Sequence, residues 1–376
     1  MANSSGSSTH GCFFRISMDK NFNWSSSYLD MNMSHCQKEN IGISFSQGFY
    51  TYVTPFVLTI GIVGNILSIV VFMSKNMRKL SASTYLAALS VSDICALFFY
   101  VFIDWLRRGL PYFPGKYEAT FLEEQGLCQL QTYLSYVSRF VSAWIIVTFT
   151  VERYIGVCHP LKRKDICGSR SSQKVIASVI VIALVLMVYK PALTGRHENT
   201  RIQQTVARCS RNPNLPLLSF ILDSIFALSI TFVPFLLISI LNFFIIRRLY
   251  LRNRRYLKKN IVTEESIIRM EFTVILLVVS FVYVVLNLPY FYFWCKRFLE
   301  VFQSKSAFFD HSEAELLVTR VVFYLNYCIN FFLYSVTGAY FRKELKVLFW
   351  YQKYHEVNNC SRLSNHSNHS TRHSWV

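Results

Sequence analysis

Seven long runs of apolar residues, separated by short polar linkers, restrict what this chain can fold into. A helix crosses a bilayer with about 20 apolar residues, so runs of this kind that carry at most one charge predict membrane spans. The runs are residues 49–73, 80–103, 128–151, 175–189, 215–246, 272–295 and 316–340. The fourth run is short, and it spans only if Lys174 and Lys190 snorkel or if the helix continues toward Leu193. The pattern predicts an all-α bundle of seven transmembrane helices.

The composition also indicates a membrane protein. Of the 376 residues, 52% are hydrophobic and 16% are charged, whereas about a quarter of the residues in a soluble protein are charged. The net charge of +18 could indicate nucleic-acid binding in a soluble protein. Here the basic residues lie mostly in the linkers, where they report membrane topology. We therefore expect membrane lipid, and no nucleic acid, as a partner.

The third run has different chemistry at its two ends. From Cys128 to Arg153 a helix rises by about 37 Å, at about 1.5 Å per residue. This exceeds the bilayer core of about 30 Å. Cys128 should therefore meet one aqueous face, and Glu152 and Arg153 should meet the other.

The charges of the linkers predict the orientation of the bundle. Basic residues are concentrated in residues 75–79, 162–164, 247–259 and 342–346. By the positive-inside rule these segments are cytoplasmic, so the N-terminus is extracellular and the C-terminus is cytoplasmic. The linker 190–216 is an exception, because it is basic although it must be external.

The N-terminal segment, residues 1–48, is rich in Ser and Asn and has no apolar stretch of the signal-peptide kind. We expect a disordered extracellular tail. Its three Asn-x-Ser acceptors, at Asn3, Asn23 and Asn32, predict N-glycosylation if the tail is outside the cell.

Short motifs follow one another along the runs in a fixed order. They are Gly64-Asn65, Leu89 to Asp93, Cys128 with Glu152-Arg153-Tyr154, Pro234, Pro289, and Asn330 to Tyr334. Over roughly residues 49–350 the chain resembles a class A (rhodopsin-like) G-protein-coupled receptor of the neuropeptide receptor group. The resemblance implies a plasma-membrane receptor that an extracellular peptide activates and that promotes nucleotide exchange on heterotrimeric G proteins. A lipid or small acidic ligand, or a receptor that binds without coupling, is the alternative.

The resemblance divides the chain into four parts. Residues 1–48 would be the extracellular tail, 49–340 the seven-transmembrane receptor domain, 341–352 an amphipathic helix on the anionic membrane surface, and 353–376 the cytoplasmic tail. Arrestin is a further expected partner. In the tail, Cys360 is a candidate for palmitoylation or an ordinary thiol. The final Ser374-Trp375-Val376 suits a PDZ-domain groove.

The chain departs from the family pattern at positions that govern switching. The fourth run lacks the usual tryptophan, the sixth has Asn287 where a tryptophan usually precedes Pro289, and the seventh has Asn330-Phe331 instead of Asn-Pro. A large aromatic switch and a helix-bending proline are thus both missing. We expect the bundle to be kept while the details of switching differ.

The resemblance assigns residues to three structural roles. It implies a disulfide between Cys128 and Cys209, which would hold the second external loop over the pocket; Cys36 and Cys295 could form another. It also implies a sodium-type pocket between the helices, which could instead hold only water. It implies a site of G-protein coupling as well, in which the pair Glu152 and Arg153 could instead be a structural charge pair. The sodium-type pocket comprises Asp93, Ser142, Asn326 and Asn330, and the coupling site comprises Glu152, Arg153, Tyr154 and Tyr334. In many members of the family an acid at the foot of the sixth helix also holds the arginine of the coupling site at rest. At that position the register here suggests Arg269, flanked by Glu265 and Glu271.

The outer half of the bundle predicts the class of ligand. Ser135 stands where amine receptors of the family have an aspartate, and no lysine occupies the seventh run, so amines and retinal are disfavoured. Polar and aromatic side chains there suit a peptide, although the aromatic ones could form a membrane-interface belt. The candidate ligand pocket is Asp104, Trp105, Arg108, Gln131, Ser135, Tyr136, Arg139, Asp223, Asn287, Tyr290 and Tyr324.

Arg139 is a single basic residue in the middle of the third run. A guanidinium there needs partners. An internal pair with Asp93 would replace sodium, whereas a contact with an acidic or carbonyl group of the ligand would make Arg139 a ligand-binding residue. We hypothesise that Arg139 and Asn287 together replace the missing aromatic switch.

Other classes of membrane protein fit the sequence less well. A transporter would show internal repeats or several paired charges in mid-membrane. An enzyme would need a nucleophile with its base, or clustered metal ligands, and we identify no catalytic residue and no metal site besides the possible structural sodium. We therefore expect a receptor that is not an enzyme and has no other cofactor.

Overall fold

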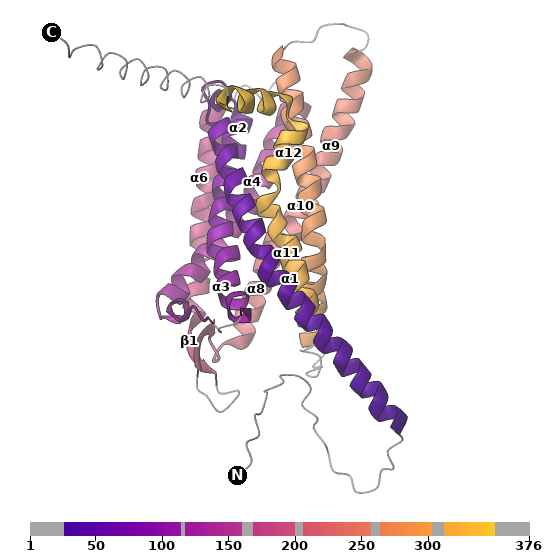
Figure 1. The fold of residues 1–376 in the computed structure, drawn as a ribbon. Coiled ribbons are helices and arrows are strands. Elements are labelled where there is room, and N and C mark those ends of the chain that lie inside the picture. Colours follow the sequence, from indigo (N-terminus) through magenta and orange to yellow (C-terminus); the bar gives the residue numbers. More distant parts are fainter. Residues whose placement is uncertain are drawn as a thin grey trace, which may run out of the picture.

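The computed structural model describes residues 26–113, 117–159, 168–199, 206–256, 264–302 and 312–349. In this part of the chain, long helices run side by side as a bundle, and a short β-hairpin lies at one end of it (Figure 1). Six helical segments are long and apolar enough to cross a membrane, and a bent pair of helices makes a seventh candidate. The predicted seven-helix bundle is therefore confirmed.

The segments follow the order of the apolar runs. α1 (Ser26–Phe72) is followed by α2 (Ser81–Ala96), which continues through a π-helical turn (Leu97–Phe102) into α3 (Ile103–Arg108), and then by α4 (Leu127–Cys158). Next come α6 (Ser169–Leu186), α7 (Tyr189–Ala192), the antiparallel strands β1 (Thr194–Asn199) and β2 (Val206–Arg211), α8 (Pro216–Ile230), α9 (Phe232–Tyr256), α10 (Glu264–Phe302), α11 (Ser312–Cys328) and α12 (Asn330–Thr337). Residues 339–349 form a last helix. Short 3₁₀ turns occupy Met77–Lys79, Leu110–Tyr112 and Thr120–Glu123.

The first and fourth spans extend beyond their apolar runs. α1 begins at Ser26, so part of the polar segment for which we expected disorder continues the first helix. Of the two alternatives for the fourth span, the continuation toward Leu193 is confirmed: the span runs on through α7 to Ala192, and Lys190 is buried rather than snorkelling to the membrane edge. A buried acidic partner on α8, described below, explains why Lys190 turns inward.

The distribution of side chains is that of a protein in lipid. Large apolar side chains such as Phe56, Val63 and Val185 are exposed on the outer faces of the helices. Polar side chains such as Asn65 and Asp93 are buried between them. Exposed apolar surface of this extent would cause aggregation in water, whereas in a bilayer it contacts the hydrocarbon of the lipids.

The end of the bundle opposite the hairpin is closed by aromatic packing. The last helix, 339–349, lies across this end (Figure 1). Phe341 is fully buried, with its ring centroid 5.1 Å from that of Phe72 and 5.8 Å from that of Tyr334. At Gly338 a Cβ would lie 2.8 Å from the carbonyl oxygen of Tyr334 and 2.9 Å from the Cβ of Phe341, so only glycine allows this close turn.

The seventh span is bent by 50° between α11 and α12, although it contains no proline. The break lies at Ile329, between two asparagines whose side chains bond to the backbone. Asn326 donates to the carbonyl of Phe323, and Asn330 donates to the carbonyl of Asn326. Such side-chain bonds compete with the helical hydrogen-bond ladder, which gives the bend a cause other than proline.

Candidate functional site

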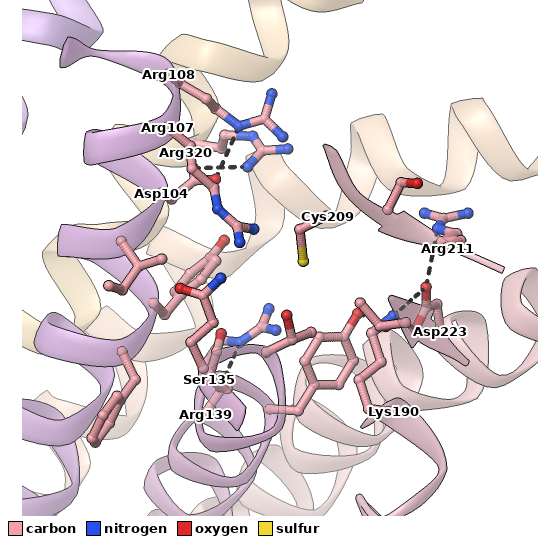
Figure 2. Close-up of a pocket in the computed structure, with 18 of the residues that line it drawn as sticks. Asp104, Arg107, Arg108, Ser135, Arg139, Lys190, Cys209, Arg211, Asp223 and Arg320 are labelled. Atoms are coloured by element: carbon pink, nitrogen blue, oxygen red, sulfur yellow. Dashed lines mark hydrogen bonds and ion pairs between the residues drawn. The ribbon is translucent and has the colours of Figure 1, made fainter. Parts of the chain in front are cut away.

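A cavity of about 440 Å³ opens between the helices at the hairpin end of the bundle. Its walls come from the end of the second span, α4, α7, the hairpin, α8, α10 and α11 (Figure 2). Six cationic side chains and two carboxylates line it, which gives a formal charge of +4. The cations are Arg107, Arg108, Arg139, Lys190, Arg211 and Arg320, and the carboxylates are Asp104 and Asp223.

One carboxylate, Asp104, organises the wall formed by the second span and α11. Its oxygens lie 2.9 Å from Nε of Arg108 and 3.0 Å from Nη1 of Arg320. The hydroxyls of Tyr324 and Tyr50 donate to the same carboxylate at 2.7 and 3.0 Å. We call these five residues the Asp104 cluster; its acid is fully satisfied, and it holds three helical spans together.

The other carboxylate, Asp223, organises the opposite wall (Figure 2). Nζ of Lys190 lies 2.7 and 2.9 Å from its two oxygens, and Nε of Arg211 on β2 lies 3.5 Å away. The hydroxyl of Tyr136 donates to it at 3.0 Å. These four residues, the Asp223 cluster, join α4, α7, the hairpin and α8.

Arg139 lies on the floor of the cavity, between the two clusters (Figure 2). Its guanidinium carbon is 4.2 Å from the ring centroid of Tyr100, 4.5 Å from that of Tyr136 and 4.9 Å from that of Phe226. Its Nε donates to the carbonyl of Ser135 at 3.0 Å. The expected pair with Asp93 is wrong: among the described residues the charge of Arg139 is held by aromatic faces and one carbonyl, not by a carboxylate.

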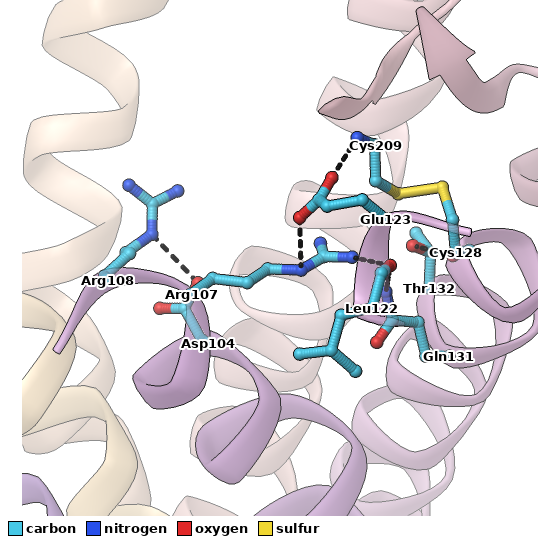
Figure 3. Close-up of polar contacts among 9 residues, drawn as sticks. All are labelled: Asp104, Arg107, Arg108, Leu122, Glu123, Cys128, Gln131, Thr132 and Cys209. Carbon is cyan, nitrogen blue, oxygen red and sulfur yellow. Dashed lines mark hydrogen bonds and ion pairs between the residues drawn. A yellow bond between two sulfur atoms is a disulfide. The ribbon is translucent and has the colours of Figure 1, made fainter. Parts of the chain in front are cut away.

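The disulfide between Cys128 and Cys209 joins the start of α4 to β2. A carboxylate beside it adds a second tie, because the backbone N–H of Cys209 donates to Glu123 (Figure 3). Arg107 contacts Glu123 at 3.7 Å and donates to the carbonyl of Leu122. The hairpin is thus attached both to α4 and to the end of the second span. Cys295, by contrast, is a free thiol, so the suggested bridge to Cys36 is wrong.

Most of the pocket residues predicted from the sequence line this cavity. They are Asp104, Arg108, Gln131, Ser135, Tyr136, Arg139, Asp223 and Tyr290. Three others do not. Tyr324 is buried behind Asp104, and the indole of Trp105 donates to the carbonyl of Thr51 instead. Asn287 is buried and donates to the carbonyl of Tyr283, and among the described residues it makes no hydrogen bond with Arg139.

Several residues of the cavity were not predicted from the sequence, notably Tyr100, Arg107, Lys190, Arg211 and Arg320. Two of them carried a usable signal. Arg320 is the single charge of the seventh run, and Lys190 lies at the end of the fourth. Isolated charges on different spans need partners within the bundle, so acids and bases of this kind can be matched with one another.

Asp93 lies deeper, in the middle of the bundle. Its two oxygens accept hydrogen bonds from Ser142 at 2.6 Å and from Asn330 at 2.7 Å. Asn326 does not bond to Asp93; its amide nitrogen donates to Phe323, and its amide oxygen is buried with no hydrogen-bond partner among the described residues. A carboxylate, a hydroxyl and an orphaned amide oxygen are the ligand types that a small hard cation takes.

The opposite end of α4 carries the acid-arginine pair. Arg153 lies 2.7 Å from a carboxylate oxygen of Glu152, donates to the hydroxyl of Ser81 at 3.2 Å, and lies over the ring of Phe149. Tyr154 packs against other aromatic rings. Tyr334 is fully buried, and within the described structure its hydroxyl has no hydrogen-bond partner.

The N-terminal part of α10 contacts the last helix. Glu271 accepts a hydrogen bond from the backbone N–H of Tyr340 at 2.6 Å. The side chains of Glu265 and Arg269, which the sequence analysis named beside it, lie outside the described residues. So do Asn3, Asn23 and Cys360, and of Asn32 only the helical backbone is described.

Comparisons with known proteins agree with this architecture. The sequence model described as "7 transmembrane receptor (rhodopsin family)" matches residues 64–334. The thyrotropin-releasing hormone receptor of Mus musculus is 26% identical over 317 residues, which cover 77% of this chain and 76% of that receptor. C-C chemokine receptor type 1 of Homo sapiens is 26% identical over 84% of this chain and 82% of its own length. A purinoceptor of Gallus gallus is 27% identical over 79% of each chain. The chain therefore belongs to the rhodopsin family of seven-transmembrane receptors.

Proposed function

We propose that this protein is a plasma-membrane receptor that an extracellular peptide activates and that promotes nucleotide exchange on heterotrimeric G proteins. One observation carries the proposal. A single helix, α4, lines the cavity at one end through Gln131, Ser135 and Arg139, and carries the Glu152–Arg153 pair at the other. A ligand in the cavity and a protein at Arg153 would therefore contact the same rigid element.

The character of the cavity supports a peptide. It combines charged clusters, hydroxyls and aromatic rings, which can hold the backbone and side chains of a peptide through charge-assisted hydrogen bonds and ring contacts. Two of the similar receptors are named for a hormone and a chemokine.

A small acidic ligand is the second candidate, and the formal charge of +4 around the cavity is the observation that favours it. One of the similar receptors is named as a purinoceptor. We place the peptide first because Arg139 has no carboxylate partner among the described residues and suits the single carboxylate group of a peptide.

The orientation follows from the charges of the linkers. The hairpin end would be extracellular and the end with Arg153 cytoplasmic, in agreement with the positive-inside rule. The helix 339–349 would lie on the inner leaflet, with Arg342, Lys343 and Lys346 toward anionic lipid. Arrestin and a PDZ-domain protein remain proposed partners of the cytoplasmic face and the C-terminal tail. A sodium ion would be held by Asp93 with Ser142 and Asn326, and there it would compensate the buried carboxylate.

A peptide screen tests the proposal. Cells that express the receptor with promiscuous G-protein reporters are exposed to a panel of amidated and free-acid peptides, and membranes from these cells are assayed for nucleotide exchange. We expect exchange to depend on a peptide and to vanish in Arg153→Ala. Binding of a peptide without exchange would instead identify a receptor that does not couple, and a response to lipids or small acids alone would contradict the peptide assignment.

A further inference from the structure

We propose that the floor of the cavity is a carboxylate subsite, in which Arg139 binds one carboxylate group of the ligand. The inference rests on the proposed function, because it names the chemistry that a peptide would need in order to fill this cavity. The source of the carboxylate is either the C-terminus of the peptide or an acidic side chain, and the experiment below separates the two.

The first argument is that Arg139 has unused hydrogen-bond donors. A guanidinium has five N–H groups, and among the described residues only Nε of Arg139 donates to an oxygen, the carbonyl of Ser135. The residue is only 8% exposed, yet it lines the cavity. Its remaining N–H groups are therefore available to donate hydrogen bonds to a ligand in the cavity.

The second argument is that the other cations of the cavity already have acids. Arg108 and Arg320 contact Asp104, whereas Lys190 and Arg211 contact Asp223. The fifth, Arg107, contacts Glu123. Arg139 is the one cavity-lining cation for which the described structure contains no carboxylate partner.

The third argument concerns geometry. The rings of Tyr100, Tyr136 and Phe226 surround the guanidinium at 4.2 to 4.9 Å and hold its plane in place. A fixed, planar fork of donors matches the two oxygens of a carboxylate, so little conformational entropy is lost when they bind. Aromatic walls also exclude water, which strengthens such a pair.

The fourth argument favours one carboxylate over a polyphosphate. A group with several negative charges needs several cations that converge on one point. Here the other cations do not converge on one point: two belong to the Asp104 cluster, two belong to the Asp223 cluster on the opposite wall, and Arg107 pairs with Glu123 (Figure 2). A single negative charge balances a single guanidinium.

Three peptide libraries test the subsite. The first contains tetrapeptides without Asp or Glu as C-terminal free acids, the second contains the same sequences as C-terminal amides, and the third contains Asp or Glu within C-terminal amides. Binding is followed by the thermal stabilisation of purified receptor, and activity by nucleotide exchange. The receptor is tested as the wild type, Arg139→Met, Arg139→Lys and Arg196→Met. The last is a matched control, because Arg196 pairs with Glu124 outside the cavity.

We expect the wild type and Arg196→Met to prefer one carboxylate library over the neutral amides by at least about tenfold, or about 1.4 kcal/mol. A preference for the first library assigns the C-terminus, and a preference for the third assigns a side chain. Arg139→Met should lose the preference, and Arg139→Lys should keep part of it. Neutral amides that are as potent as the acids on the wild type, or an undiminished preference in Arg139→Met, would overturn the subsite but leave the peptide receptor intact. No response to any library would overturn the peptide ligand itself.

Discussion

The ammonium group of Lys190 lies 2.7 Å from one carboxylate oxygen of Asp223 and 2.9 Å from the other, with only 6% and 12% of the two side chains exposed. The pair joins the end of the fourth span to the fifth. The two residues differ in the other partners that could compensate their charges. Asp223 also contacts Arg211 and Tyr136, whereas the other interaction of the Lys190 ammonium group among the described residues is with the ring face of Tyr136, at 4.5 Å.

This asymmetry predicts an order of stability among variants. Removing one partner of a buried ion pair costs about 3 to 5 kcal/mol, because the other charge is left buried without compensation. Asp223→Asn strands Lys190 and should lower the melting temperature of the purified, ligand-free receptor most. Lys190→Met should lower it less, since Arg211 can still compensate Asp223.

The double variant provides the control. Lys190→Met with Asp223→Asn removes both charges, so its loss should be smaller than the sum of the two single losses. Glu124→Gln, which breaks an exposed pair with Arg196, should change the melting temperature little. Equal losses in both single variants, with strict additivity in the double, would show that the two charges do not depend on each other.

The second prediction concerns the disulfide. It links Cys128 and Cys209 across a sequence separation of 81 residues, and it fixes β2 against α4. Cys209→Ala should therefore reduce surface expression and peptide potency together, since removing a native disulfide typically costs about 2 to 5 kcal/mol. Cys295→Ala is the matched control, because this thiol is free. Normal surface levels and potency in Cys209→Ala would show that the hairpin needs no bridge.

The architecture was largely predictable from the sequence, since apolar runs longer than the bilayer core leave few alternatives to a helical bundle. What the sequence could not provide was the partner of each isolated charge. The burial of Lys190 depends on where Asp223 lies in space, and the choice of aromatic faces over Asp93 depends on how Tyr100 and Tyr136 approach Arg139. The bend at Ile329 could not be predicted either, because it arises from side-chain hydrogen bonds to the backbone and not from a proline, which is visible in a sequence.

The third prediction concerns coupling. Arg153 contacts Glu152 and Ser81 at the end of α4 opposite the cavity, so it does not contact a ligand there. Arg153→Ala should keep peptide affinity within a few-fold of the wild type while nucleotide exchange is abolished. Radioligand binding and exchange are measured on the same membranes. Arg170→Ala, an exposed arginine at the start of α6, should leave both unchanged. Exchange at the wild-type rate in Arg153→Ala would remove the basis for the coupling assignment.

The fourth prediction concerns the hydrogen bond from the N–H of Tyr340 to Glu271, which ties the foot of α10 to the first turn of the helix 339–349. A carboxylate is favourable at a helix N-terminus, where backbone N–H groups are otherwise unsatisfied. Any movement of α10 away from this helix breaks the bond. Hydrogen bonds to charged groups are worth about 1.5 to 3 kcal/mol, so Glu271→Ala should make the movement easier and raise ligand-independent nucleotide exchange several-fold.

Glu344 supplies the matched control. It lies on the same last helix, and its carboxylate accepts hydrogen bonds from Ser74 and Asn76, in the linker between α1 and α2 rather than on α10. Glu344→Ala should therefore destabilise the docking of the helix 339–349 without raising basal exchange. Basal exchange is measured at matched surface density with no peptide present. If both variants raised it equally, loosening of the last helix would be the cause, and the specific tie between Glu271 and Tyr340 would not hold the receptor at rest.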